Sequence, residues 1–78
     1  MGKIFIMEFT QAKTRLGARI KQLRKHKNLT QEELASPFNS EKSFICDIEK
    51  GRKNVTLQTL CTIAQKLEVE LHELFIWE

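Results

Sequence analysis

The segment from residue 41 to residue 49 carries polar side chains at the spacing of one helix face. At about 100° per residue, this polar face spans an arc of roughly 140° and consists of Lys42, Ser43, Cys46 and Asp47. Ile45 and Ile48 point to the other side. Lys42 donates hydrogen bonds, Ser43 donates or accepts them, and Asp47 accepts them. The segment is therefore suited to hydrogen-bond a partner on one face while it packs on the other.

Catalysis and metal binding have no comparable pattern. The two cysteines and two histidines, Cys46, Cys61, His26 and His72, do not have the spacing of metal ligands. No nucleophile–base set and no Gly-rich phosphate loop is present. We expect no enzymatic activity, no metal, no cofactor and no small-molecule ligand. Cys46 is interpreted as an inert small residue, and a redox-sensitive thiol on the polar face is the alternative.

Positive charge is concentrated at the amino-terminal end of the chain. The formal net charge of +3 divides into +7 for residues 1–28, −1 for residues 29–53 and −3 for residues 54–78. Such asymmetry favours a partner with a negative surface, most commonly nucleic acid. A solvated basic helix face explains the charge alone equally well.

A chain of 78 residues accommodates one small domain. Such a chain buries only about 60% of its unfolded surface, so we expect oligomerisation to add stability. A pair of cysteines is too few for a disulfide scaffold, and both are expected to be free thiols. No stretch reaches the roughly 18 apolar residues of a membrane span. We therefore expect a cytoplasmic protein without membrane contact.

Helical periodicity defines the first two elements that would position the polar face. Apolar residues recur through a predicted helix at 10–27, which Asn28 ends in a left-handed conformation. Thr30 and Glu33 have the spacing of a capping box, so a second helix should begin at residue 31. That helix must be short, because Pro37 lacks a backbone N–H and disfavours helix at the residue before it.

Three further helices are predicted after the turn at Asn39. The third spans 41–49 and ends before Gly51, and the fourth follows the N-cap Thr56. Its apolar stripe is predicted to consist of Leu57, Leu60, Cys61, Ala64 and Leu67. A last short helix covers about 70–76. The run 3–9 is rich in β-branched and aromatic residues, and its state is left open. The chain is therefore predicted to be all-α with five helices.

The ordered set of motifs from residue 16 to residue 75 resembles the lambda-repressor and Cro-like (Xre-type) helix-turn-helix family. The matching motifs are Leu16-Gly17-x-Arg19-Ile20-x-x-Leu23-Arg24, Leu29-Thr30-Gln31-Glu32-Glu33-Leu34-Ala35, Ile45-x-x-Ile48-Glu49-x-Gly51-x-x-Asn54, Leu57-x-x-Leu60, Ile63-Ala64, Leu67 and Leu71-x-Glu73-Leu74-Phe75. The resemblance implies a compact five-helix DNA-binding domain in which helices 2 and 3 form the helix-turn-helix. The predicted organisation is an amino-terminal extension at 1–9 and a single domain at 10–78. A start at Met7 would leave residues 1–6 as the extension.

The resemblance puts the third helix in the DNA major groove. The base-contacting residues are then predicted to be Glu41, Lys42, Ser43, Phe44 and Asp47. Two of these have alternatives: Glu41 as an acid favoured by the helix dipole, and Phe44 as a core contact to the second helix. The resemblance also implies phosphate contacts from Gln31, Lys50, Arg52, Lys53 and Asn54. Arg24 and Glu49 match positions that form a structural ion pair in the family.

The carboxyl end is more apolar than a terminus needs. We predict that Phe75, Ile76 and Trp77 form a homodimer interface, which would set two reading helices about one DNA turn apart. The predicted function is a sequence-specific transcriptional regulator that binds a palindromic operator as a homodimer. Asn54-Val55-Thr56-Leu57 favours the controller proteins of restriction-modification systems. The alternative is an antitoxin-like protein-interaction module built on the same fold.

Overall fold

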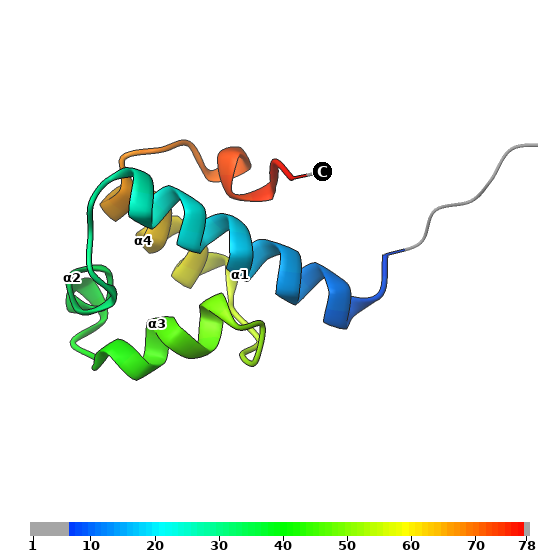
Figure 1. The fold of residues 1–78 in the computed structure, drawn as a ribbon, viewed down its shortest axis with the longest axis horizontal. Helices are drawn as coiled ribbons and strands as arrows, with labels where there is room; N and C mark the ends of the chain where they lie inside the picture. Colours follow the sequence, from blue (N-terminus) through cyan, green and yellow to red (C-terminus); the bar gives the residue numbers. More distant parts are fainter. Residues whose placement is uncertain (1–6, 78) are drawn as a thin grey trace, which may run out of the picture.

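The computed structural model describes residues 7–77, and these contain four α-helices, two 3₁₀ helices and no β-strand (Figure 1). In chain order the elements are α1 (Phe9–His26), α2 (Gln31–Ala35), η1 (Ser36–Phe38), α3 (Lys42–Glu49), α4 (Leu57–Leu67) and η2 (Leu71–Phe75). Most of the predicted extension at 1–9 lies outside the described residues. No helix within 7–77 is long and apolar enough to cross a bilayer.

The longest helix, α1, confirms the predicted first helix to within one residue at each end. Its core face carries Leu16 and Ile20, which are 7% and 0% exposed. The helix ends before Asn28, which has a φ of 58° as the sequence predicted. At the other end Phe9 is already helical, so part of the run left open at 3–9 belongs to α1.

The short helix α2 begins with the predicted capping box. The Glu33 backbone N–H donates to Thr30 Oγ1 at 3.0 Å, and the Thr30 N–H donates to Glu33 Oε1 at 2.8 Å. The bond from the Thr30 backbone N–H lowers the pKa of the Glu33 carboxyl below its usual 4.5, because it favours the ionised form. Pro37 lies in η1, and Asn39 turns the chain with a φ of 54°.

The apolar stripe predicted for α4 was wrong at two positions. Leu57 is 65% exposed and Cys61 is also exposed. The buried face consists of Leu60, Ile63, Ala64 and Leu67. The centre of this face lies about 70° from Leu57 and about 110° from Cys61 around the helix axis, at 100° per residue. The sequence therefore identified the correct helix, but the predicted buried face was centred too close to Leu57 and Cys61.

The predicted fifth α-helix is instead the 3₁₀ helix η2, so the count of five helices was wrong. Its backbone bonds join residues three apart, as in the Glu73 N–H to Glu70 C=O bond of 3.0 Å. In a 3₁₀ helix, residues i and i+3 eclipse one another. Leu74 is therefore fully buried and Leu71 is partly buried against the same core. Five residues suffice to close the core in this way without a complete α-helix.

Figure 1 shows α3 on one side of α1 and η2 on the other. Gly17 lies where α1 meets α3. A Cβ atom at Gly17 would come within 2.3 Å of the Ile48 carbonyl oxygen and 2.6 Å of the Glu49 carbonyl oxygen. The missing side chain therefore lets the carboxyl end of α3 approach the backbone of α1, which fixes the position of the polar face of α3.

Candidate nucleic-acid interface

The structure separates the two faces of α3 as the helical spacing predicted. Ile45 and Ile48 are 0% and 3% exposed and belong to the core. On the opposite face, Lys42 and Ser43 are exposed, and Asp47 is partly exposed. Cys46 lies beside them, partly exposed and with a free thiol. Donors and acceptors of hydrogen bonds are thus presented to solvent on a helix whose other face is held by the core.

The flanking residues Glu41 and Phe44 have different surroundings. Glu41 is exposed at the N-cap of α3, where its side chain makes no capping hydrogen bond. Phe44 is partly buried, with its ring centroid 5.0 Å from that of Phe38 in η1. The ammonium of Lys53 lies 5.4 Å from the Phe44 centroid. The packing of Phe44 against the core favours the alternative of a core contact, but its aromatic partner Phe38 lies in η1 and not in the second helix as that alternative had it.

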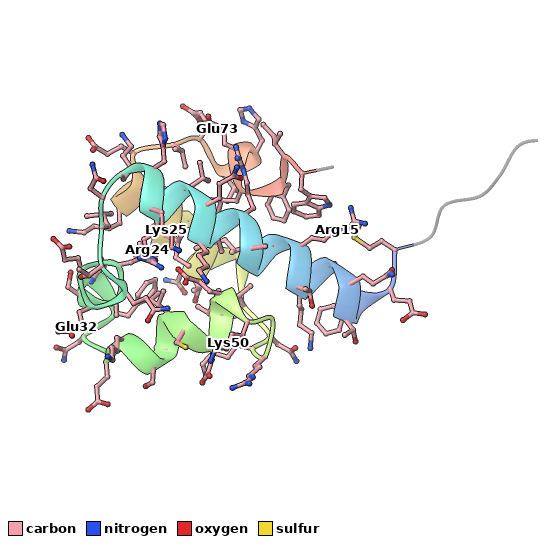
Figure 2. All side chains as sticks on the ribbon, in the orientation of Figure 1. Arg15, Arg24, Lys25, Glu32, Lys50 and Glu73 are labelled. Carbon is pink, nitrogen blue, oxygen red and sulfur yellow. The ribbon has the colours of Figure 1, made fainter. Side chains whose placement is uncertain are left out.

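Arg24 and Glu49 form the ion pair that the family resemblance implies. Arg24 Nε lies 2.6 Å from Glu49 Oε2, and the two side chains are 9% and 2% exposed. A second Arg24 nitrogen donates to Glu49 Oε1 at 3.2 Å, and a third donates to the Leu29 carbonyl at 2.7 Å. Figure 2 shows Arg24 reaching from α1 toward α2 and α3. The pair therefore links α1 to α3 and to the start of α2.

Gln31 joins the same group from the first residue of α2. Its Nε2 donates to Glu49 Oε1 at 3.1 Å, and its side chain is partly buried. An amide nitrogen carries two hydrogens, so one remains after this bond. The sequence did not indicate that Gln31 contacts Glu49, because the two residues meet only when α2 packs on α3.

The loop after α3 presents three cations. Lys50, Arg52 and Lys53 are all exposed. The loop is shaped by Gly51, which has a φ of 73°, and by an Arg52 N–H bond to the Asp47 carbonyl at 2.9 Å. Figure 2 shows Lys50 at the carboxyl end of α3.

Asn54 accepts a hydrogen bond from a residue that the sequence did not suggest as part of the site. Lys13 Nζ, on the first half of α1, donates to Asn54 Oδ1 at 3.3 Å. The two residues are 41 positions apart in the chain, so no local pattern relates them. The tertiary structure therefore adds α1 to the neighbourhood of the loop.

The apolar carboxyl end forms one side of a separate surface. Phe75 and Ile76 are 45% and 53% exposed, whereas Trp77 is partly buried against the core. The rings of Phe75 and Trp77 lie 5.9 Å apart. Ile76 and Trp77 line an open cavity of about 600 Å³ together with residues on one side of α1. Within residues 7–77 no group of three or more His, Cys, Asp or Glu side chains could hold a metal ion.

Two short helices, α2 and α3, joined by a turn and braced by α1, define a helix-turn-helix. The model of the helix-turn-helix domain family matches residues 17–76, and the chain belongs to this family. It is 41% identical over 56 residues to the immunity repressor protein of Bacillus phage phi105, covering 72% of this chain and 39% of the repressor. It is 39% identical over 64 residues to the control protein C.MunI of a Mycoplasma species, covering 81% and 86% of the two chains.

Solved structures of two restriction-modification controller proteins share the fold. C.AhdI from Aeromonas hydrophila superposes with a TM-score of 0.75 and 35% identity, covering 80% of this chain and 94% of that chain. The C.Esp1396I tetramer in complex with its natural 35 base-pair operator gives a TM-score of 0.71 and 30% identity, covering 90% and 88%. The chain is therefore similar in fold and sequence to controllers, one of which is seen on its operator.

Proposed function

We propose that this protein is a sequence-specific DNA-binding transcriptional regulator, without catalytic activity, that inserts α3 into the major groove. The observation that carries the proposal is the exposed polar face of α3, presented within a helix-turn-helix whose orientation is fixed by the buried Arg24–Glu49 pair. An α-helix fits the major groove, where each base pair offers a distinct set of donors and acceptors. The similarity to an operator-bound controller supports the same use of the fold.

Lys42 is the principal base-contacting residue in this proposal. It is exposed at the first position of α3, and its ammonium can donate to guanine O6 or N7. Ser43 adds a donor or acceptor beside it. Asp47 and Glu41 accept from cytosine N4 and repel misplaced phosphates, so they select among sequences more than they add affinity. Phe44 supports these residues through its contact with Phe38.

Phosphate contacts come from the loop after α3 and from the first residue of α2. Lys50, Arg52, Lys53 and Asn54 belong to the loop at the carboxyl end of α3. Gln31 in α2 supplies the amide hydrogen that Glu49 does not use. A phosphate bound there would be linked through Gln31 to Glu49. These contacts would fix the register of α3 on the duplex without reading sequence.

The regulator acts as a homodimer on a palindromic operator and belongs among restriction-modification controllers. The exposed side chains of Phe75 and Ile76, with Trp77 beside them, offer an apolar surface for self-association. A two-fold axis there would place two α3 helices about 34 Å apart on one DNA face. Residues 10–78 form its single domain, extended at the amino end by α1 starting at Phe9. The names of similar proteins, C.MunI and C.AhdI, support the controller role.

A salt-dependent gel shift tests the proposal. Labelled duplexes that tile the region upstream of its own gene are titrated with the full chain from about 50 to 200 mM salt, with mixed-sequence DNA as competitor. We expect one duplex to bind at least about a thousandfold more tightly than mixed-sequence DNA. Failure to bind any upstream duplex below about 100 mM salt would exclude the DNA function and favour the protein-interaction alternative.

A further inference from the structure

A group of four cations lies where the first half of α1 meets the loop after α3. Lys50, Arg52 and Lys53 come from the loop, and Lys13 comes from α1. The Lys13 ammonium is joined to the loop by its 3.3 Å hydrogen bond to Asn54 Oδ1. Two elements that are distant in the sequence therefore contribute positive charge to one surface.

Close backbone packing keeps these two elements together. A Cβ atom at Gly51 would lie 2.9 Å from Thr14 Cα, so the loop rests directly on the residue next to Lys13. Gly51 also requires its positive φ of 73°, which side chains rarely adopt. The loop is thus held against α1 by its main chain, and this places the backbone of Lys13 beside the loop, where its side chain can reach Asn54.

Aromatic rings position two of the four ammonium groups. Lys13 Nζ lies 4.6 Å from the centroid of Phe9, one turn earlier in α1. Lys53 Nζ lies 5.4 Å from the centroid of Phe44. A ring face attracts a cation through its quadrupole but does not neutralise its charge. Neither contact supplies a counter-charge, and both reduce the conformational freedom of the lysine side chain.

No carboxylate within residues 7–77 forms an ion pair with these four cations. The ion pairs found within residues 7–77 are Arg24–Glu49 and Lys27–Glu68, and neither includes Lys13 or a loop cation. An ammonium group has three N–H donors, and Asn54 takes one of those on Lys13. Lys13 consequently retains both charge and hydrogen-bonding capacity for an anionic partner.

We propose that Lys13 is a phosphate-contacting residue, which extends the DNA-binding surface from the loop after α3 onto α1. The inference rests on the proposed DNA function, since it names a further residue of that interface. Lys13 and the loop cations bind the same stretch of the DNA backbone, with Asn54 holding the Lys13 ammonium in place. Because a phosphate contact is sequence-independent, Lys13 contributes to affinity on every duplex and does not discriminate between bases.

The test is the salt dependence of binding by the variant Lys13→Gln. Glutamine keeps an amide N–H donor that can approach Asn54 but removes the charge. Equilibrium binding of the full chain is measured by fluorescence anisotropy, on an upstream duplex and on a mixed-sequence duplex, between about 50 and 200 mM salt. Each lost phosphate contact reduces the slope of log K against log salt by about 0.9, and a bound homodimer loses two contacts, so the slope should fall by about 1.8 and the affinity by about sixtyfold at 0.1 M salt. We expect this loss on both duplexes.

The matched control is Lys66→Gln, which makes the same charge change in the last turn of α4, the helix that bears no proposed DNA contact. It should leave the slope unchanged, and Lys13→Arg should restore the slope lost in Lys13→Gln. Equal slopes for Lys13→Gln and Lys66→Gln would overturn the role of Lys13 while leaving the proposed function intact. If the wild-type protein bound neither duplex, both the role of Lys13 and the proposed DNA function would be overturned. Thermal unfolding of each variant identifies any loss that arises from instability.

Discussion

At the scale of single residues, the buried Glu49 carboxylate joins side chains from two other helices. Its side chain is 2% exposed and accepts hydrogen bonds from Arg24 and Gln31, which belong to two other helices. A charge removed from water in this way requires a partner, because its desolvation is not otherwise offset. The group therefore makes the orientation of α3 depend on both α1 and α2.

Removal of one partner of this pair should be more harmful than removal of both. We expect Arg24→Met to reduce the free energy of unfolding by about 3–5 kcal/mol, because Glu49 is left buried and unpaired. The double variant Arg24→Met with Glu49→Leu should recover much of this loss. Urea unfolding of the single and double variants measures the coupling. If the losses of unfolding free energy in the two single variants summed to the loss in the double variant, the pair would contribute no mutual stabilisation.

Lys42 should behave as a residue that reads bases. We expect Lys42→Ala to weaken binding to the specific duplex by about 1–3 kcal/mol and to change binding to random DNA little. The comparison is Lys50→Ala, whose loss should be similar on both duplexes because a phosphate contact does not depend on sequence. Parallel titrations on the two duplexes measure the difference. Equal losses for Lys42→Ala on both would reassign Lys42 to phosphate contact.

At the scale of elements, α2 is only five residues long and depends on its amino-terminal cap. An isolated helix of this length is not stable in water, so its backbone N–H groups need partners outside the helix. The Thr30–Glu33 capping box supplies partners for the N–H groups of Glu33 and of the N-cap residue Thr30. The short helix before the turn is therefore stabilised by side-chain capping as well as by its packing.

The capping box should make stability depend on acid pH. Since the folded pKa of Glu33 is lowered, its ionisation stabilises the fold fully above the usual value of 4.5, and this contribution is lost as the pH falls through the lowered pKa. We expect Glu33→Gln to be less stable than wild type near neutral pH and to approach it in acid. Urea unfolding from neutral to acid pH measures the difference in unfolding free energy between Glu33→Gln and wild type. Glu32→Gln is the control, and a gap for Glu33→Gln that persists in strong acid would contradict the assignment.

The contact of α1 with α3 depends on one missing side chain. We expect Gly17→Ala to reduce the free energy of unfolding by about 3 kcal/mol, because its Cβ would meet backbone carbonyl oxygens of α3 that cannot move independently. Lys21→Ala, an exposed change one turn later in α1, should stay within about 0.5 kcal/mol of wild type. Thermal or urea unfolding tests both. A stable Gly17→Ala protein would mean that the two helices separate without cost.

At the scale of the whole molecule, three apolar regions are exposed within residues 7–77. They are the carboxyl end with Phe75 and Ile76, Leu57 at the start of α4, and Met7 and Phe9 at the amino-terminal end of α1. A larger contiguous apolar patch is the kind of surface that association buries. Phe75, Ile76 and Trp77 are consecutive in the chain, whereas Leu57 has only Cys61 one turn later, so the carboxyl end is a better interface than the start of α4.

Self-association should therefore respond to Ile76 and not to Leu57. We expect Ile76→Glu to weaken the dimer at least about tenfold, because it introduces a charge at the centre of the apolar end. Leu57→Glu, at a position that is even more exposed, is the matched control and should leave the dimer unchanged. Sedimentation equilibrium at micromolar concentrations measures both. A wild-type monomer at high micromolar concentration, or an effect of Leu57→Glu alone, would contradict the interface.

Local sequence rules predicted the parts of the fold whose causes are local. The capping box at Thr30, the left-handed Asn28 and Asn39, and the end of α2 near Pro37 follow from side chains that act within a few residues. The buried face of α3 was predictable too, because Ile45 and Ile48 lie together on one side of the helix and polar residues occupy the other. The orientation of α4 was not, because its apolar residues cover an arc of about 160° at 100° per residue, which is wider than the buried face, and only the neighbouring helices select which part is buried.

The sequence by itself determined an all-helical chain, the polar face of α3 and a basic amino-terminal half. Periodicity and charge are properties of the chain before it folds, which is why these features could be predicted. The tertiary structure alone decided that Gln31 contacts Glu49, that Phe44 packs on Phe38, and that Lys13 reaches the loop at Asn54. Each of these contacts joins different elements, so it depends on the distances and angles that core packing sets.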